Sequence, residues 1–355
     1  MSARLAVDIG GTFTDVVLEA GTTAHSIKLL TTPDAPERAV LEGVRAILAE
    51  AKVAAADVTL VVHGTTLATN ALIERKGART ALLTTEGFRD SVEMAWEHRF
   101  EQYDIYMERP DPLVPRDLRF GIPERVASDG AVLMPLDEKA VRAVAIDLRQ
   151  RKIEAVAVCF LHSFTHEAHE RRAGQILAEE LPGVAISLSC EVCPEIREYE
   201  RTSTTIANAY VLPRMAGYLG QLETDLKKEG IAGPLLLMMS SGGITTVDTA
   251  RRYPVRLVES GPAGGAILAS SQASRAQAPE KLTEADPYAK SMGFRLDTSK
   301  VDQARYPRHE VAQLCSKCQL WDVAAAKDDF AACSFFGDRH TPKGGWCKNY
   351  KVIKA

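Results

Sequence analysis

The sequence contains no apolar run near the roughly 18 residues that a membrane-spanning helix needs, so no membrane span is expected. Its first residues, Met1 to Arg4, lead directly into a strand-like run instead of the apolar core of a signal peptide. As written, the chain is therefore expected to stay in the cytoplasm. A strong charge of either sign is also lacking, because 43 Lys and Arg stand against 47 Asp and Glu. This balance provides no dense basic face, so nucleic acid is not expected as a partner.

Aromatic residues and cysteines are scarce over most of the chain and concentrated near its end. Phe, Trp and Tyr make up 6% of the 355 residues, and there are seven cysteines. Four of these cysteines fall within 33 residues, at Cys315, Cys318, Cys333 and Cys347. The same segment holds Trp321, Phe330, Phe335, Phe336, Trp346 and Tyr350. Such clustering predicts a buried centre that is ligated by thiolates.

Four thiolates are sufficient for either an iron-sulfur cluster or a structural zinc ion. Zinc ribbons generally use two C-x2-C pairs. This segment has one such pair, Cys315 and Cys318, followed by two separate cysteines. The spacing favours a 4Fe-4S cluster, with structural zinc and unliganded thiols as the alternatives.

The C-terminal part of the chain resembles the high-potential iron-sulfur proteins. The resemblance is carried by Asp286-Pro287, Val301-Asp302, the stretch from Phe330 to Cys333, and Gly345-Trp346-Cys347. It implies a 4Fe-4S cluster on the four cysteines that exchanges single electrons with a redox protein partner. Members of this family are usually periplasmic, and they usually carry a tyrosine over the cluster where this sequence has Phe294.

Two apolar runs joined by a Gly-Gly turn open the chain, from Leu5 to Leu18, and predict a β-hairpin. Glycines allow close approach of the backbone to a ligand, and successive N-H groups with nearby hydroxyls can hold phosphate oxygens. The first aspartate of the turn is then positioned to hold a magnesium ion or its water. An ordinary turn is the alternative. The candidate phosphate-binding residues are Asp8, Gly10, Gly11, Thr12, Thr14 and Asp15.

Strands alternate with helices over the next 200 or so residues, which predicts an α/β sheet. The expected helices cover Pro36–Glu50, a segment capped by Asp137, and Ile196–Lys228. The expected strands cover Val58–Val62, Arg79–Thr84, Ala155–Leu161 and Leu235–Met239. Thr65 or Thr66 is expected to cap a helix, and the proline-containing segment from Tyr103 to Asp129 is expected to be irregular.

Two further groups have a spacing that is compatible with metal ligands. His162, His166 and His169 lie close together, but no thiol or carboxylate spacing completes a site. Cys190 and Cys193 form a single C-x2-C pair without a second pair beside it. Neither group is expected to bind a metal.

Several strings in the first 267 residues resemble the hydantoinase A and 5-oxoprolinase family. They cover residues 63–74, 194–205, 240–243 and 259–265, and residues 8–15 resemble the first phosphate loop of the actin, hexokinase and Hsp70 ATPases. The resemblance implies ATP and magnesium as cofactors and activation of a lactam or carbonyl oxygen by phosphorylation. It also implies a partner, because a hydantoinase B-like subunit usually completes the activity.

After Glu259 this resemblance predicts a second phosphate loop and an adenosine pocket, but the sequence becomes small and polar, as is typical of a linker. We therefore expect a truncated α/β ATPase-like domain at 1–268, a linker at 269–279, and a small, mostly irregular iron-sulfur domain at 280–355. The expected function is a single-electron carrier. The alternatives are an ATP-dependent hydantoinase or 5-oxoprolinase-type amidohydrolase subunit that opens a cyclic amide with a partner, and a fusion without function. Whether the chain is an enzyme stays open, since the predicted ATP site has only one side.

Overall fold

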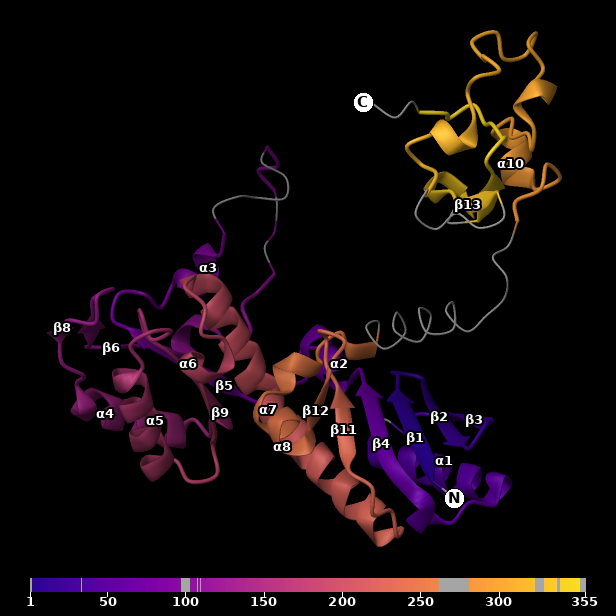
Figure 1. Cartoon of the computed structure of the whole chain (residues 1–355). Coiled ribbons are helices and arrows are strands. Elements are labelled where there is room, and N and C mark those ends of the chain that lie inside the picture. The colour runs from indigo at the N-terminus through magenta and orange to yellow at the C-terminus, as the bar shows by residue number, and fades with distance from the viewer. Residues whose placement is uncertain are drawn as a thin grey trace. The chain divides into compact units, whose positions relative to one another are not determined.

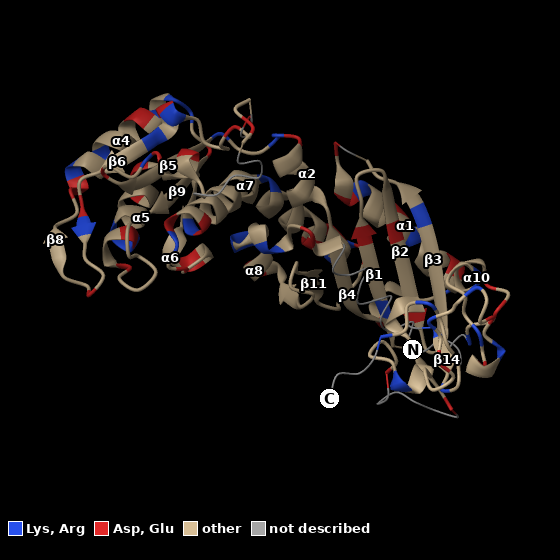
Figure 2. Ribbon diagram, turned by 90° about the horizontal axis from the view of Figure 1, so that it is seen from above, with Lys and Arg blue, Asp and Glu red and all other residues tan. Residues whose placement is uncertain are grey.

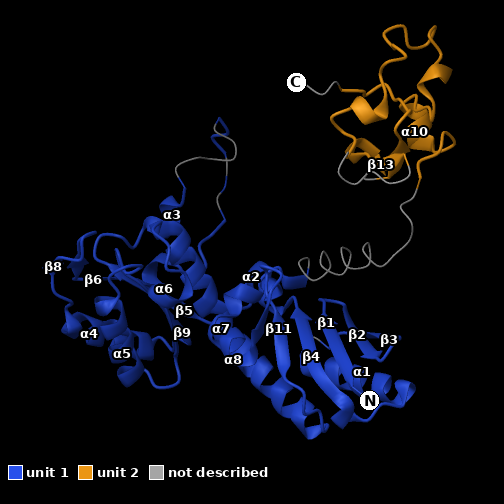
Figure 3. Ribbon diagram, viewed as in Figure 1, with its two compact units in different colours: residues 1–268 blue, residues 269–355 orange. Residues whose placement is uncertain are grey.

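The computed structural model describes residues 2–32, 34–96, 103–106, 108, 110–261, 281–322, 329–336 and 339–351. The chain divides into two compact units, residues 1–268 and residues 269–355, which Figure 3 colours separately. The linker predicted at residues 269–279 lies outside the described residues. Over the part of the chain that is described, no helix is long and apolar enough to cross a membrane.

Unit 1 begins with a six-stranded sheet in the order β12-β11-β4-β1-β2-β3 (Figure 1). Its strands are β1 (Ala3–Ile9), β2 (Phe13–Ala20), β3 (Thr23–Leu30), β4 (Val58–Thr65), β11 (Leu235–Met238) and β12 (Ile244–Thr246). The first two strands pair antiparallel, which confirms the predicted hairpin. The strands β1, β4 and β11 are parallel to one another. Burial alternates strictly along β1, so one face of the sheet is in the core and the other is exposed.

Two helices cover the buried face of this sheet. The helix α1 (Pro36–Ala51) and the C-terminal half of α7 (Glu198–Lys228) contribute Val44, Ile47 and Leu219 to the same core as the strands. Shorter elements complete this part: α2 (Leu67–Ile73), α8 (Val247–Arg252), and the 3-10 turns η1 (Ala55–Asp57) and η3 (Pro254–Leu257). The helices α1 and α7 match the ranges that the sequence predicts to within two residues.

A second sheet in unit 1 has four parallel strands in the order β10-β9-β5-β6. These are β5 (Thr80–Thr85), β6 (Arg119–Ile122), β9 (Ala155–Cys159) and β10 (Ala185–Leu188). The two central strands are buried along their whole length, as expected for a parallel sheet with both faces covered. Around it lie α3 (Ser91–Met94), α4 (Glu138–Gln150), α5 (Ala168–Glu180), α6 (Ser189–Val192), the N-terminal half of α7, the turn η2 (Arg116–Leu118) and the ribbon of β7 (Arg125–Val126) and β8 (Val132–Met134).

Three predictions from the sequence can be compared with the structure of unit 1. The segment from Tyr103 to Asp129 is not wholly irregular, because β6 pairs with β5 within it. With only four residues, β6 is too short to give a periodic signal in the sequence. It becomes a strand because it pairs with β5. Asp137 caps α4 as expected, with its carboxylate accepting from the Ala140 N-H at 3.0 Å. Thr66 occupies the N-cap position of α2, but its hydroxyl donates to the Ile9 carbonyl instead of capping.

Unit 2 has few regular elements, as expected for a small irregular module. They are α10 (Pro287–Ser291), η4 (Thr298–Lys300), η5 (Cys315–Lys317), the hairpin of β13 (Phe330–Ala332) and β14 (His340–Pro342), and η7 (Ser334–Phe336). Its core joins apolar residues such as Leu282, Ala289 and Phe294 to the four thiols. The thiols are thus part of the only core that the described residues of this unit form.

Candidate functional site

The strand ends of the six-stranded sheet bring together the turns that the sequence singles out. Parallel strands end at a common edge, where ligands of open α/β sheets bind. Here β1 leads into the Gly10-Gly11 turn, β4 into residues 65–70, and β11 into residues 240–243. The segment 259–261 joins them, because the Ser260 hydroxyl donates to the Thr65 carbonyl at 3.1 Å. We call these four segments the strand-end site.

Asp8 lies directly beside Gly64 in this site. The two residues are partners in the β1–β4 register, and a Cβ on Gly64 would stand 2.7 Å from the Asp8 Oδ1. A side chain at position 64 would therefore displace the carboxylate. On the other side Asp8 pairs with Asp15, whose carboxylate forms an ion pair of 2.7 Å with Lys28. Although Asp8 stays open to solvent, partial desolvation and then the Asp15 charge raise the pKa of its carboxyl, and Lys28 opposes them.

The Gly10-Gly11 turn is closed by hydrogen bonds that involve the candidate threonines unequally. The Gly10 N-H donates to the Phe13 carbonyl at 2.8 Å. Thr14 is fully buried, and its hydroxyl bonds to that of Thr31 at 3.0 Å, which in turn donates to the Gly10 carbonyl at 2.9 Å. Thr14 therefore supports the turn from beneath, whereas Thr12 is exposed at its tip.

His63 supports the strand-end site from the core. Its Nδ1 lies 3.2 Å from the Val7 carbonyl, and its Nε2 lies 2.8 Å from the hydroxyl of Tyr218 on α7. A neutral ring that donates from Nδ1 and accepts at Nε2 satisfies both contacts. Burial lowers the pKa of His63 to about 4, in agreement with a neutral ring. Sequence reasoning missed Tyr218, since it is 155 residues away and in no motif.

The three histidines near β9 do not converge on one ion. His162 contacts the Val126 carbonyl, His166 the Ser128 carbonyl and His169 the Glu124 carboxylate, at 2.8, 3.2 and 2.8 Å. These are separate partners, so the contacts explain each ring without a metal.

Glu170 forms a buried polar centre that the sequence did not indicate. Its carboxylate is fully buried and accepts from the Phe160 N-H, the Ser189 hydroxyl and the Cys190 N-H, at 3.0, 2.8 and 2.7 Å. Desolvation raises its pKa. Desolvation and the Glu170 charge also raise the pKa of the Cys190 thiol, so that thiol stays protonated. A protonated thiol is a poor nucleophile.

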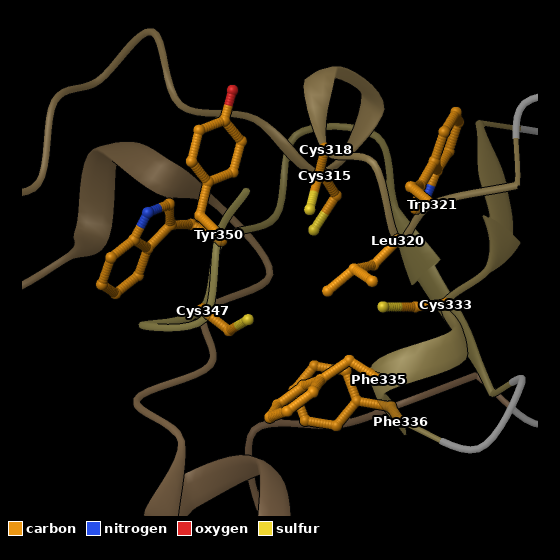
Figure 4. A pocket seen from close by; sticks show the side chains of 10 residues that line it. Cys315, Cys318, Leu320, Trp321, Cys333, Phe335, Phe336, Cys347 and Tyr350 are labelled. Carbon is orange, nitrogen blue, oxygen red and sulfur yellow. The ribbon is translucent and has the colours of Figure 1, made fainter. Parts of the chain in front are cut away.

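The four C-terminal cysteines of unit 2 line one pocket. Figure 4 shows their sulfurs directed into a common space. Its remaining walls are apolar and aromatic, and they consist of Leu320, Trp321, Phe335, Phe336, Trp346 and Tyr350. All four thiols are buried and form no disulfide. Phe294 does not line the pocket and packs behind Phe336, with the ring centres 5.4 Å apart.

Short local structures hold these cysteines in place. Cys315 is the first residue of the turn η5 and Cys318 directly follows it, and the Cys318 N-H donates to the Cys315 carbonyl at 2.9 Å. Cys333 directly follows β13, and its backbone forms an isolated antiparallel β-bridge with Trp321. The fourth cysteine follows Gly345, where a Cβ would come within 3.1 Å of the Cys315 sulfur. A side chain at this position would force the sulfur and the nearby carbonyls of Arg295 and Pro342 to shift.

Burial in the pocket disfavours the thiolate forms of Cys315 and Cys347. Desolvation raises the pKa of Cys315 to about 12 and that of Cys347 to about 11, and the neighbouring thiols add to the effect. The Thr341 side chain opposes the first shift and the Asn349 N-H opposes the second. Ligation must therefore release protons, which couples metal uptake to pH.

The four buried thiols are soft donors of the kind that bind iron-sulfur clusters or zinc. Over the described residues, no group of three or more His, Cys, Asp or Glu side chains is close enough to hold one metal ion. Zinc requires four ligands around one centre. In a 4Fe-4S cluster each thiolate binds a different iron, so the sulfurs stand farther apart around a larger body.

Comparison with known proteins gives three family-model matches along the chain. Residues 4–181 match the family model for the hydantoinase/oxoprolinase N-terminal region, and residues 201–282 match the model for hydantoinase/oxoprolinase. The chain therefore belongs to the hydantoinase/oxoprolinase family, and unit 1 has a mixed α/β fold. Residues 281–353 match the model for high potential iron-sulfur protein.

Individual proteins and solved structures are similar to about three quarters of the chain. The caprolactamase subunit alpha of Pseudomonas jessenii is 37% identical over 270 residues, which are 73% of this chain and 38% of that protein. The structure of the ATP-dependent caprolactamase from the same organism has a TM-score of 0.70 at 36% identity and covers 76% of this chain and 40% of that chain. A nucleotide-free acetone carboxylase structure has the same TM-score at 27% identity, over 77% and 40%. The chain thus spans about two fifths of the length of these relatives.

The match of unit 2 to a solved structure is weaker. The Rhodoferax fermentans high-potential iron-sulfur protein is 34% identical and covers 21% of this chain and 100% of that chain, with a TM-score of 0.20. A score this low supports no conclusion about the fold. The family-model match and the thiol pocket remain as the observations on unit 2.

Proposed function

We propose that the strand-end site binds the phosphate groups of ATP together with a magnesium ion. Asp8 would hold the ion or one of its waters, and the backbone N-H groups of Gly11 and Thr12 would face the phosphate oxygens, while the Gly10 N-H closes the turn by donating to the Phe13 carbonyl. Asp15 anchors Lys28 beside them, and Thr14 supports the turn. The observation that carries this proposal is the meeting of three strand ends at one edge of the sheet, with Gly64 leaving space for the Asp8 carboxylate.

The reaction class we propose is the ATP-dependent opening of a cyclic amide. Transfer of the γ-phosphoryl group to the amide oxygen releases ADP and makes the carbonyl carbon a better electrophile. Attack by water then breaks the C–N bond and releases phosphate. The similarity to a caprolactamase subunit and to ATP-dependent enzymes supports this class. Since that relative is a subunit, we propose a hydantoinase B-like partner.

This function has more support from the comparisons than the electron-carrier function that the sequence analysis places first. The family models for unit 1 match 178 and 82 residues, from 4–181 and 201–282. The iron-sulfur model matches 73, from 281–353.

Calorimetric titration of the full chain with Mg-ATP tests the proposal. Asp8→Asn should weaken binding about tenfold or more, because it removes the charge that faces the ion. Asp57→Asn is the matched control, since Asp57 precedes the amino end of β4, at the opposite edge of the sheet. If both variants lost the same affinity for Mg-ATP, or if Asp8→Asn bound Mg-ATP as tightly as the parent, the ATP site would not lie at this edge of the sheet.

A second function is favoured by the thiol pocket of unit 2. We propose that Cys315, Cys318, Cys333 and Cys347 ligate one 4Fe-4S cluster and that unit 2 exchanges single electrons with a redox protein partner. The cluster supplies a one-electron couple, and the protein residues hold it and exclude water. The meeting of four buried thiols in an apolar, aromatic pocket carries this proposal.

Iron and sulfide analysis of the purified full chain tests this second function. We expect about four irons and four sulfides per chain, brown colour, no EPR signal as isolated and a signal on oxidation. Cys333→Ser should lose the iron, whereas Cys159→Ser, a change at a buried cysteine of unit 1, should keep it. Zinc alone in the parent protein would contradict the proposal.

A further inference from the structure

Asn70 is a polar residue of the strand-end site to which the proposed function gives no role. It lies on α2 and is half-buried. If Gly11 carried a Cβ, that atom would stand 3.5 Å from the Asn70 Nδ2. The amide nitrogen therefore borders the side-chain face of the Gly10-Gly11 turn. Because Gly11 is exposed, a ligand that approaches this turn from solvent can also reach the amide.

Thr66 fixes which way the amide of Asn70 is turned. The Thr66 hydroxyl donates to the Ile9 carbonyl, at the end of β1, at 3.1 Å. Since a hydroxyl has one hydrogen to donate, its oxygen can only accept from Asn70, and the contact of 3.3 Å between them requires the NH2 group of the amide. This contact uses one of the two amide N-H bonds. Among the described residues the second N-H has no acceptor, so it is left for a ligand.

A phosphate oxygen suits this second N-H. The backbone N-H groups of Gly11 and Thr12, to which we assign the phosphates, belong to the same turn that Asn70 borders. A phosphate oxygen has several lone pairs, so it can accept from a backbone N-H and from a side-chain amide together. Its negative charge also makes each of these hydrogen bonds stronger than one to a neutral acceptor.

We propose that the Asn70 side-chain amide donates a hydrogen bond to a phosphate oxygen of ATP at the strand-end site. The inference rests on the ATP-binding function proposed for unit 1. It adds a side chain from α2 to a site whose phosphate donors otherwise come from the backbone of the β1–β2 turn. Asn70 is thus a binding residue, and Thr66 holds its amide against the end of β1.

Nuclear magnetic resonance of the side-chain amides tests this contact directly. The sequence has three asparagines, Asn70, Asn208 and Asn349, so a full chain made with ¹⁵N-labelled asparagine has three side-chain NH2 groups to observe. Mg-ATP should shift the signals of the Asn70 group, which any substitution of Asn70 identifies by their loss. Asn208 is the internal control, because it is buried in unit 1 and its NH2 group donates to the Ser187 hydroxyl and the Arg252 carbonyl, at 3.0 and 3.2 Å. Its signals should not move.

Calorimetric titration with Mg-ATP distinguishes a phosphate contact from support of Thr66 alone. Asn70→Ala should weaken binding about tenfold, as expected for loss of a hydrogen bond to a charged acceptor. Asn70→Asp is nearly isosteric but brings a negative charge towards the phosphates, so it should weaken binding roughly a further tenfold. Gln175→Glu is the control, since it adds the same charge on α5, where Arg172 contacts the side chain at 3.3 Å, and it should bind as the parent does.

The outcomes keep the two proposals apart. If the parent binds Mg-ATP without a shift of the Asn70 signals, or if Asn70→Ala binds as tightly as the parent, the inference is overturned and the ATP site stays in place. Equal affinities in Asn70→Ala and Asn70→Asp also overturn it, because support of Thr66 alone would lose the same donor in both. A parent chain that does not bind Mg-ATP overturns the proposed ATP-binding function and this inference together.

Discussion

Gly64 leaves room in the strand-end site for the side chain of Asp8. Its missing side chain leaves the volume that the Asp8 carboxylate occupies, at the point where β1 and β4 run side by side. Gly64→Ala should push the carboxylate away and weaken Mg-ATP binding about tenfold, or ~1.4 kcal/mol. Gly217→Ala is the control, since a Cβ there on α7 would meet nothing within 4 Å. Calorimetric titration measures both, and a Gly64→Ala protein with the parent's affinity would exclude Asp8 from the site.

His63 should make the stability of unit 1 depend on pH. Its pKa falls from the ordinary 6.5 to about 4 on folding, so the folded protein holds the ring neutral while the unfolded chain takes up a proton below pH 6.5. The stabilisation is complete above pH 6.5 and is lost as the pH falls towards 4. Between pH 7 and pH 5 it amounts to about 2 kcal/mol.

Urea unfolding followed by circular dichroism at these two pH values measures this effect. His63→Gln should reduce the difference between pH 7 and pH 5, because glutamine can keep both hydrogen bonds and does not titrate in this range. His25→Gln changes a more exposed histidine on β3 and should retain the difference. Equal pH dependence in both variants would assign the acid sensitivity to other groups.

The sequence identifies site residues when their chemistry is local in the chain. The four cysteines and the Gly10-Gly11 turn form recognisable spacings, and the structure brings each set together. Tyr218, Glu170 and Thr341 escaped notice because their partners lie far away in sequence or are defined only by burial. A threonine in a short strand is as compatible with the surface as with the core, so the burial of Thr341 emerges only from packing.

The helix α7 is the element that connects the two sheets of unit 1. Near its start Ile206 packs into the core of the four-stranded sheet, and further along Leu219 packs into the core of the six-stranded sheet. One continuous helix in both cores should make them unfold together. Ile206→Ala and Leu219→Ala should each lower the free energy of unfolding by about 3 kcal/mol, because both leave a cavity.

Urea unfolding of these variants should show one transition that moves as a whole. Ile146→Ala on α4 is the control, since this side chain is 51% exposed and its loss should change stability by at most about 0.5 kcal/mol. Two separate transitions in either core variant would show that the sheets unfold independently.

The helices and strands that the sequence predicts are those with a strong apolar periodicity or with a continuous run of apolar residues. The helices α1 and α7 and the strands β4, β5, β9 and β11 follow from apolar patterns. The strand β6 did not, because four residues that begin with a buried arginine carry no strand signal of their own. Pairing with a neighbour decides such an element.

At the scale of the whole molecule, charge gives little indication of a partner. Figure 2 shows Lys and Arg interspersed with Asp and Glu over α4, α5 and α6. Many of these side chains form ion pairs, such as Arg172 with Glu138 at 2.8 Å and Arg171 with Glu191 at 2.8 Å. This arrangement matches the nearly balanced charge of the sequence.

Because the two units have separate cores, a destabilising substitution in one unit should leave the other unit folded. The core of unit 2 includes the thiols themselves, so we expect it to fold only when they are ligated. Cys333→Ser should therefore abolish the visible absorption and the structure of unit 2, while the main unfolding transition of unit 1 stays where it is. Leu82→Ala, which empties part of the four-stranded core, should do the opposite: it should lower the stability of unit 1 by about 3 kcal/mol and leave the visible spectrum intact. Hydrogen exchange read by mass spectrometry assigns each change to its unit. Loss of protection in β1 and β4 upon Cys333→Ser would show that the two units depend on each other for folding.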